Sequence, residues 1–137
     1  MIKKYRNIGV VAHDAGSGNI IAEWIKKNKK KNFIIKVSGP AKTIFESNKI
    51  KLKLNNSFND IISQSDFILS GTSAKSKIDH KIRVLAKKNK VLNAGLLDNW
   101  SLYEKGFLFK KKLILPDEIW VTDQKAKSIA VNIFKNR

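Results

Sequence analysis

Strand-like and helix-like segments alternate along the whole sequence, and this order constrains the fold more than any other feature. The apolar run at residues 8–12 is continuous and short, which is typical of a strand buried on both faces. Further strands are predicted at residues 33–37, 67–69, 91–97 and 119–121, with amphipathic helices between them. Since parallel strands need crossover connections, the alternation predicts a parallel sheet covered by helices on both faces.

Residues 50–54 alternate between apolar side chains and lysine, a pattern that predicts an edge strand protected by charge. With this strand the sheet has six members in the order 3-2-1-4-5-6, and its topological switch point lies between the first and fourth strands. We therefore predict one doubly wound, mostly parallel, Rossmann-like α/β domain over residues 1–137, built as three layers.

Helix boundaries and surface positions can also be predicted. Asn19 suits the N-cap of the first helix, and Pro40 suits the first turn of a short second helix. Short and long helices are expected near residues 60–64 and 78–86, and a last helix carries Ala126, Ile129, Ala130 and Ile133 at helical spacing. His80 stands among basic residues in the long helix and is predicted to be a surface residue.

Composition narrows the class of protein. The chain is 42% hydrophobic and 28% charged, which is ordinary for a globular domain. No apolar run is long enough to span a bilayer, and the first residues lack the features of a secretory signal. The chain contains no cysteine, which excludes disulfides and thiolate metal sites. These features are typical of a soluble cytoplasmic protein.

The formal net charge of +17 raises the question of nucleic-acid binding. The 28 basic residues are nearly all lysine, whereas nucleic-acid sites usually use arginine for bidentate and stacking contacts. Codon bias also produces a chain rich in lysine, asparagine and isoleucine. We therefore expect nucleic acid to be an unlikely partner, and both a solvated lysine surface and a functional basic patch stay open.

Polar and glycine-rich segments follow the carboxyl ends of the predicted strands, where open α/β sheets bind their ligands. His13 and Asp14 are the candidate catalytic residues. The candidate ligand-binding residues are Gly16, Ser17, Gly18, Asn19, Gly39, Gly71, Thr72, Ser73, Asp98, Asn99 and Trp100.

The chemistry of these segments leaves several alternatives. The glycines before the first helix could present N–H groups to a phosphate or carboxylate, or could only form a tight turn. Ile21 stands where a dinucleotide fingerprint has its third glycine, and a P-loop lysine is missing, so no cofactor is expected. His13 could act as a general base, anchor a hydroxyl group beside Asp14, or be a buried structural histidine. No spacing suggests a metal site.

Five segments, in this order, resemble the N-terminal half of GT-B-type proteins, which include glycosyltransferases and UDP-N-acetylglucosamine 2-epimerase-like proteins. They lie at residues 11–16, 39–45, 71–73, 97–100 and 115–121. The resemblance implies a Rossmann-like lobe that contacts a sugar or acceptor, while a second lobe grips the nucleotide diphosphate. It places residues 13–18, 71–73 and 98–100 in the cleft between the lobes. The second lobe is expected to be absent from this chain.

Two functions follow as hypotheses. The first is a glycosyltransferase-like or nucleotide-sugar-processing lobe that binds a sugar, nucleotide-sugar or phosphate ligand and is completed by a separate C-terminal lobe or a homo-oligomer. Whether such a lobe catalyses a reaction alone is open. The second is a non-catalytic module that binds an anionic ligand, a partner protein or nucleic acid.

Overall fold

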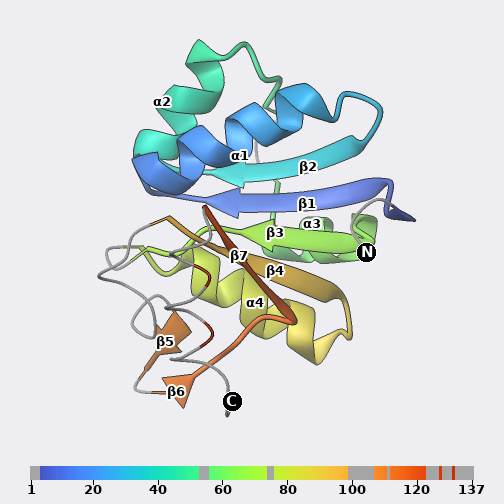
Figure 1. The fold of residues 1–137 in the computed structure, drawn as a ribbon. Helices are drawn as coiled ribbons and strands as arrows, with labels where there is room; N and C mark the ends of the chain where they lie inside the picture. Colours follow the sequence, from blue (N-terminus) through green and yellow to red (C-terminus); the bar gives the residue numbers. More distant parts are fainter. Residues whose placement is uncertain are drawn as a thin grey trace.

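A parallel five-stranded sheet forms the centre of the protein in the computed structural model (Figure 1). The structure describes residues 4–52, 56–73, 76–98, 107–110 and 112–122, together with residues 127 and 131. The sheet has the order β2-β1-β3-β4-β7, and all neighbouring strands are parallel. Its strands are β1 (Asn7–Ala12), β2 (Asn32–Val37), β3 (Phe67–Ser70), β4 (Leu92–Leu97) and β7 (Glu118–Val121).

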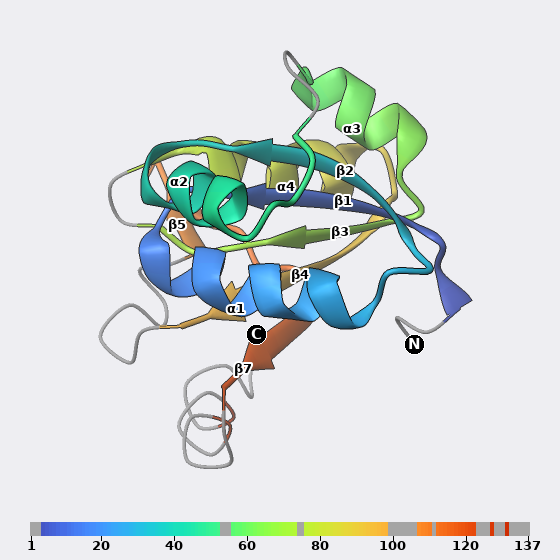
Figure 2. The ribbon, with the colours of Figure 1, turned by 90° about the horizontal axis from the view of Figure 1, so that it is seen from above.

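Helices cover both faces of this sheet (Figure 2). On one face lie α1 (Ala15–Lys27) and α2 (Gly39–Ser47), and on the other lie α3 (Phe58–Gln64) and α4 (Ile78–Lys88). A small antiparallel hairpin, β5 (Leu108–Phe109) and β6 (Lys112–Leu113), stands between β4 and β7 in the chain. The doubly wound three-layer α/β arrangement predicted from the alternating pattern is therefore present.

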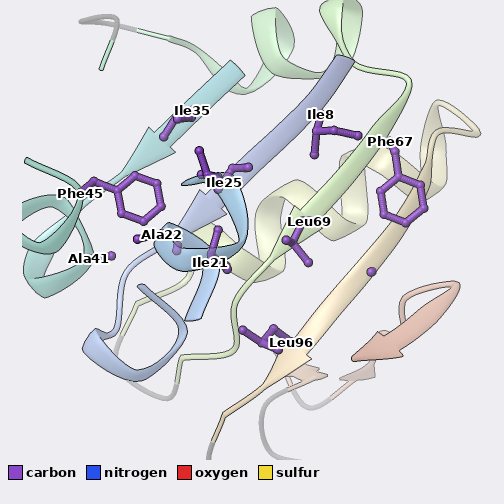
Figure 3. Packing of buried hydrophobic residues seen from close by; sticks show 13 residues of the cluster. Ile8, Ile21, Ala22, Ile25, Ile35, Ala41, Phe45, Phe67, Leu69 and Leu96 are labelled. Carbon is purple, nitrogen blue, oxygen red and sulfur yellow. The ribbon is translucent and has the colours of Figure 1, made fainter. Parts of the chain in front are cut away.

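Two apolar clusters pack between the helices and the two faces of the sheet, because alternate side chains of each strand point to opposite faces. Ile8 and Val10 face α1 and α2, while Val11 faces α3 and α4. Figure 3 shows the first cluster, where Phe45 of α2 and Ile21 of α1 meet the side chains of the strands. Burial of large side chains such as Phe45 and Phe67 contributes about 2–3 kcal/mol each and holds the helices against the sheet.

The prediction of an edge strand at residues 50–54 has to be corrected. Residues 50–52 have no regular secondary structure, and residues 53–55 lie outside the described part of the chain. Ile50 and Leu52 still pack on the first cluster, so these two apolar side chains are partly buried without forming a strand. Asn56 donates its side-chain N–H to the carbonyl of Ile35 at 2.8 Å, which takes up a hydrogen-bonding group at the β2 edge.

Five strands rather than six therefore form the sheet among the described residues, and β2 stands at the edge that the predicted order gave to residues 50–54. The remaining five strands keep their predicted relative order. The switch point between β1 and β3 is therefore where the sequence placed it.

Two further predictions about helices are corrected. The first helix begins at Ala15 with Asp14 as its N-cap residue, so Asn19 is an exposed position inside α1 and not its cap. Pro40 lies in the first turn of α2, as predicted. His80 is 4% exposed and not a surface residue. The predicted last helix at residues 126–133 lies almost wholly outside the described residues.

No helix in the described part of the chain has the length and apolar character needed to cross a membrane.

Candidate functional site

The carboxyl ends of β1 and β3 meet at the switch point, and a hydrogen bond joins the two loops that follow them. Ser73 donates its hydroxyl to Asp14 Oδ1 at 2.8 Å, although 59 residues separate the two along the chain. The Ser73 oxygen also accepts the backbone N–H of Ser76 at 3.0 Å. Gly71 lies so close to Ser17 that a Cβ on it would approach Ser17 Oγ to 2.5 Å. The loops at residues 13–17 and 71–73 therefore lie together at the switch point.

Asp98, which follows β4, places its carboxylate over the amino end of α1. A Cβ on Gly16 would overlap Asp98 Oδ2, so only glycine leaves room for the carboxylate at this position. The backbone of Ser17 hydrogen-bonds the carboxylate, and Thr72 Oγ1 lies 3.4 Å from Asp98 Oδ1 and 3.0 Å from the carbonyl of Leu96. The helix dipole and the free N–H groups of α1 are thus directed at an anion that the protein itself supplies.

Burial raises the pKa of Asp98, and the nearby charge of Asp14 raises it further. The hydrogen bonds from Ser17 and Thr72 act in the opposite direction because they stabilise the carboxylate. In a chain with a formal net charge of +17, this edge of the sheet is a locally acidic site.

His13 lies beside these groups and is oriented by the loop after β2. Its Nδ1 is 2.8 Å from the hydroxyl of Ser38, and its ring lies against Gly39, where a Cβ would overlap the imidazole. Gly39 has φ +53, a backbone conformation that favours glycine. The His13 ring is therefore held in place on one side and is half-buried.

A buried polar cluster lies directly beneath the β3–α4 loop. Arg83 is 1% exposed and donates from Nη1 to Ser70 Oγ at 2.9 Å and to the carbonyl of Gly71 at 2.8 Å. Its Nη2 is 2.9 Å from His80 Nδ1, and the guanidinium lies 5.1 Å from the centre of the Phe107 ring. Arg83 therefore fixes the backbone of the loop that carries Thr72 and Ser73.

The titration of this cluster is shifted by burial. Burial and the neighbouring Arg83 charge lower the pKa of His80 to about 4. His80 is then neutral at pH 7, so Nδ1 accepts from Arg83, and the ring also hydrogen-bonds the Ser73 backbone. Burial lowers the pKa of Arg83 itself to about 10, although the charge of Asp79 opposes this.

Asp79 adds a third carboxyl group to the region. It is fully buried in the first turn of α4, and neither of its oxygens has a hydrogen-bond partner among the described residues. Burial raises its pKa to about 7, the Arg83 charge lowers it, and the charges of Asp14 and Asp98 raise it again. The three carboxyl groups therefore interact electrostatically across the switch point.

The structure separates the predicted site residues into those that meet and those that do not. His13, Asp14, Gly16, Ser17, Gly71, Thr72, Ser73 and Asp98 lie at the switch point or beside it. Gly18 is buried against Ala41, where it allows α1 and α2 to pack closely, and Asn19 is exposed on α1. Gly39 supports His13. Asn99 and Trp100 lie outside the described residues.

Asp79 and Arg83 are not among the residues predicted from the sequence, and His80 is buried where a surface position was predicted. A helical signal was available, because positions 79 and 83 share a face with the apolar positions 82 and 86. Polar residues on the apolar stripe of a helix indicate a buried polar cluster. In the described residues no group of three or more histidine, cysteine, aspartate or glutamate side chains is arranged to hold a metal ion.

Comparison with known proteins gives a likeness in fold. No protein-family model matches the sequence, and no curated protein matches it. Among solved structures, the chain is similar to S. aureus MnaA, which was solved in complex with UDP. The TM-score is 0.65 and the sequence identity is 15%, over 96% of this chain and 41% of MnaA. The chain therefore spans about two fifths of that protein and shares its Rossmann-like fold over this part.

Proposed function

We propose that this chain is one lobe of a nucleotide-sugar-processing protein and that its switch point binds the sugar through hydroxyl groups. The observation that carries the proposal is the position of the Asp98 carboxylate over Gly16 and the amino end of α1. Carboxylates accept hydrogen bonds from sugar hydroxyls, whereas they repel phosphate. Asp14 and Asp98 would accept from the ligand, and the hydroxyl of Thr72 lies beside them.

His13 would donate to or accept from a sugar oxygen, or act as the base that removes a hydroxyl proton. Its ring is positioned by Ser38 and Gly39 next to the Asp14 turn. A proton acceptor must reach the group that it deprotonates, and His13 is the half-buried imidazole at this edge. The inner cluster of Asp79, His80 and Arg83 would act indirectly by holding Gly71 in place.

The nucleotide diphosphate would be bound outside this lobe. The amino end of α1, which the sequence left open as a phosphate site, a carboxylate site or a tight turn, already holds Asp98. The resemblance to GT-B-type proteins and the shared fold with a UDP-bound protein both support a second lobe that completes the site. The carboxylates of Asp14 and Asp98 would repel an anionic ligand, which disfavours the alternative of a simple anion-binding module at the switch point.

Titration of the ¹⁵N-labelled protein tests this proposal. We expect UDP-N-acetylglucosamine and free N-acetylglucosamine to shift the amide signals of residues 13–18 and 71–73, with inorganic phosphate leaving them in place. Asp98→Ala should weaken sugar binding by about tenfold or more, because a hydrogen bond to a charged group contributes roughly 1.5–3 kcal/mol.

Two further variants sharpen the test. Gly16→Ala should have a similar effect on binding, since its Cβ would displace the Asp98 carboxylate. Asn19→Ala changes an exposed position on the same helix and should leave the affinity unchanged. Phosphate-induced shifts at residues 15–18 without sugar-induced shifts would support the anion-binding alternative instead.

A further inference from the structure

A hollow lies away from the switch point, where α1 and α2 end beside β2. Helix α1 begins at the carboxyl edge of the sheet and ends at Lys27, close in the chain to the start of β2 at Asn32. The hollow is open to solvent and has a volume of about 890 Å³, within the range of small-molecule sites. Its apolar surface comes from Ile25, Phe33, Ile35 and Ile50.

Lysines surround this apolar surface. Lys26, Lys29, Lys49 and Lys51 line the hollow, and none of its lining residues is acidic. Lys26 is already engaged, since its Nζ lies 3.1 Å from both Glu23 Oε1 and Asn48 Oδ1. Among the described residues, no ion pair is formed by Lys29, Lys49 or Lys51. An apolar surface with unpaired positive charges at its rim is complementary to a molecule that is apolar at one end and anionic at the other.

A peptide is a poorer match than a lipid-like molecule. Strand β2 is the edge of the sheet, but the side chain of Asn56 donates to the carbonyl of Ile35 at 2.8 Å. The ammonium group of Lys36 in turn donates to the carbonyl of Asn56 at 3.0 Å, which holds that segment beside β2. The edge is thus obstructed at the level of the hollow, so an added peptide strand would lose main-chain hydrogen bonds there.

We propose that this hollow binds an anionic amphiphile, with its apolar chain on Ile25, Phe33 and Ile50 and its phosphate headgroup among the lysines. Lysine suits this role because its ammonium is a compact point charge that binds phosphate without a fixed geometry. The inference is independent of the proposed sugar site, which lies at the carboxyl ends of β1 and β3 and shares no residue with the hollow.

Decyl phosphate, used below its micelle-forming concentration, is a suitable probe. In ¹⁵N spectra of the full chain we expect it to shift the amide signals of Asn48, Lys49 and Ile50 in a saturable way. Inorganic phosphate lacks the apolar chain and decyl maltoside lacks the charge, so neither should produce saturable shifts at these residues.

Two triple variants separate a built site from general attraction to a basic protein. The first combines Lys29→Gln, Lys49→Asn and Lys51→Gln. The control combines Lys87→Gln, Lys88→Gln and Lys90→Asn, which removes the same charge from exposed positions on and after α4. Asn is used at Lys49 and Lys90 because both have positive φ, 59 and 57.

The first triple variant should bind decyl phosphate with an affinity lowered by about tenfold or more. The control variant should keep the wild-type affinity. Equal losses in both variants would overturn the proposal, since general charge would then explain binding. Equal shifts by inorganic phosphate would also overturn it, as would binding of an alternating Glu-Leu peptide with no response to decyl phosphate. Thermal unfolding midpoints of all three proteins confirm that the comparison is made on folded chains.

Discussion

Relative to the wild type, the Asp79→Asn variant is expected to gain on the order of 3 kcal/mol in free energy of unfolding as the pH rises from about 4 to about 6.5. The carboxyl group of Asp79 is buried, and its pKa is raised to about 7, chiefly by burial. The folded protein therefore keeps a proton that the unfolded chain loses near its ordinary pKa of 3.8. The stabilisation from Asp79 is complete below that value and is lost as the pH rises through about 7.

His80 has the opposite effect over nearly the same interval. Its pKa is lowered from 6.5 to about 4 by burial and by Arg83, so the unfolded chain binds the extra proton. Stabilisation from His80 is complete above about pH 6.5 and is lost as the pH falls through about 4. Each group changes stability by about 1.4 kcal/mol per pH unit, and in the wild type the two changes offset each other. The Asp79→Asn substitution removes the change in stability that comes from Asp79 and leaves the change that comes from His80.

Urea unfolding at half-unit pH intervals measures this difference. His80→Asn is the matched variant, because its amide oxygen can still accept from Arg83 Nη2 while the side chain no longer titrates. Relative to wild type, its stability should fall as the pH rises through the same interval. If the two variants gave parallel curves, the opposed titration of Asp79 and His80 would be wrong.

Arg83→Met is expected to lower the free energy of unfolding by on the order of 3–5 kcal/mol. Methionine fills much of the volume but donates no hydrogen bond. The change would leave the Gly71 carbonyl and His80 Nδ1 without the donors that they have now, in a region closed to water. It would also remove the positive charge that lowers the pKa of Asp79 and the contact with the Phe107 ring.

Arg6→Met is the control, since it makes the same chemical change at an exposed position and should alter stability by no more than about 0.5 kcal/mol. Arg83→Lys should be intermediate, because one ammonium cannot replace the two nitrogens that reach Gly71 and His80. Urea unfolding measures all three. Equal, small losses for Arg83→Met and Arg6→Met would show that the cluster contributes little to stability.

The sequence predicted the edge of the sheet that carries the candidate site, but it did not predict how Asp98 is placed within it. His13, Asp14 and Ser73 follow buried strands, and parallel strands bring their carboxyl ends together, so the proximity of these residues could be predicted. The position of the Asp98 side chain at the amino end of α1 could not be predicted. It depends on the direction of one side chain across 82 residues of sequence and on the missing Cβ of Gly16.

Residues 50–52 of the strand predicted at residues 50–54 form no strand, for a related reason. An alternating pattern predicts which side chains are buried, and Ile50 and Leu52 are partly buried because they pack on the first cluster. It does not state which backbone groups will pair. At the β2 edge the Asn56 side chain provides the partner for Ile35 instead.

The sequence by itself determined the layered parallel sheet, its switch point between β1 and β3, and the edge at which polar residues gather. These follow from apolar periodicity and from the handedness of crossovers, which are properties of short segments. Only the tertiary structure decided that Asp79, His80 and Arg83 are buried and that Asp98 supplies the anion at α1. Both depend on partners from distant segments, and the pKa of a carboxyl group is set by what surrounds it rather than by its neighbours in the chain.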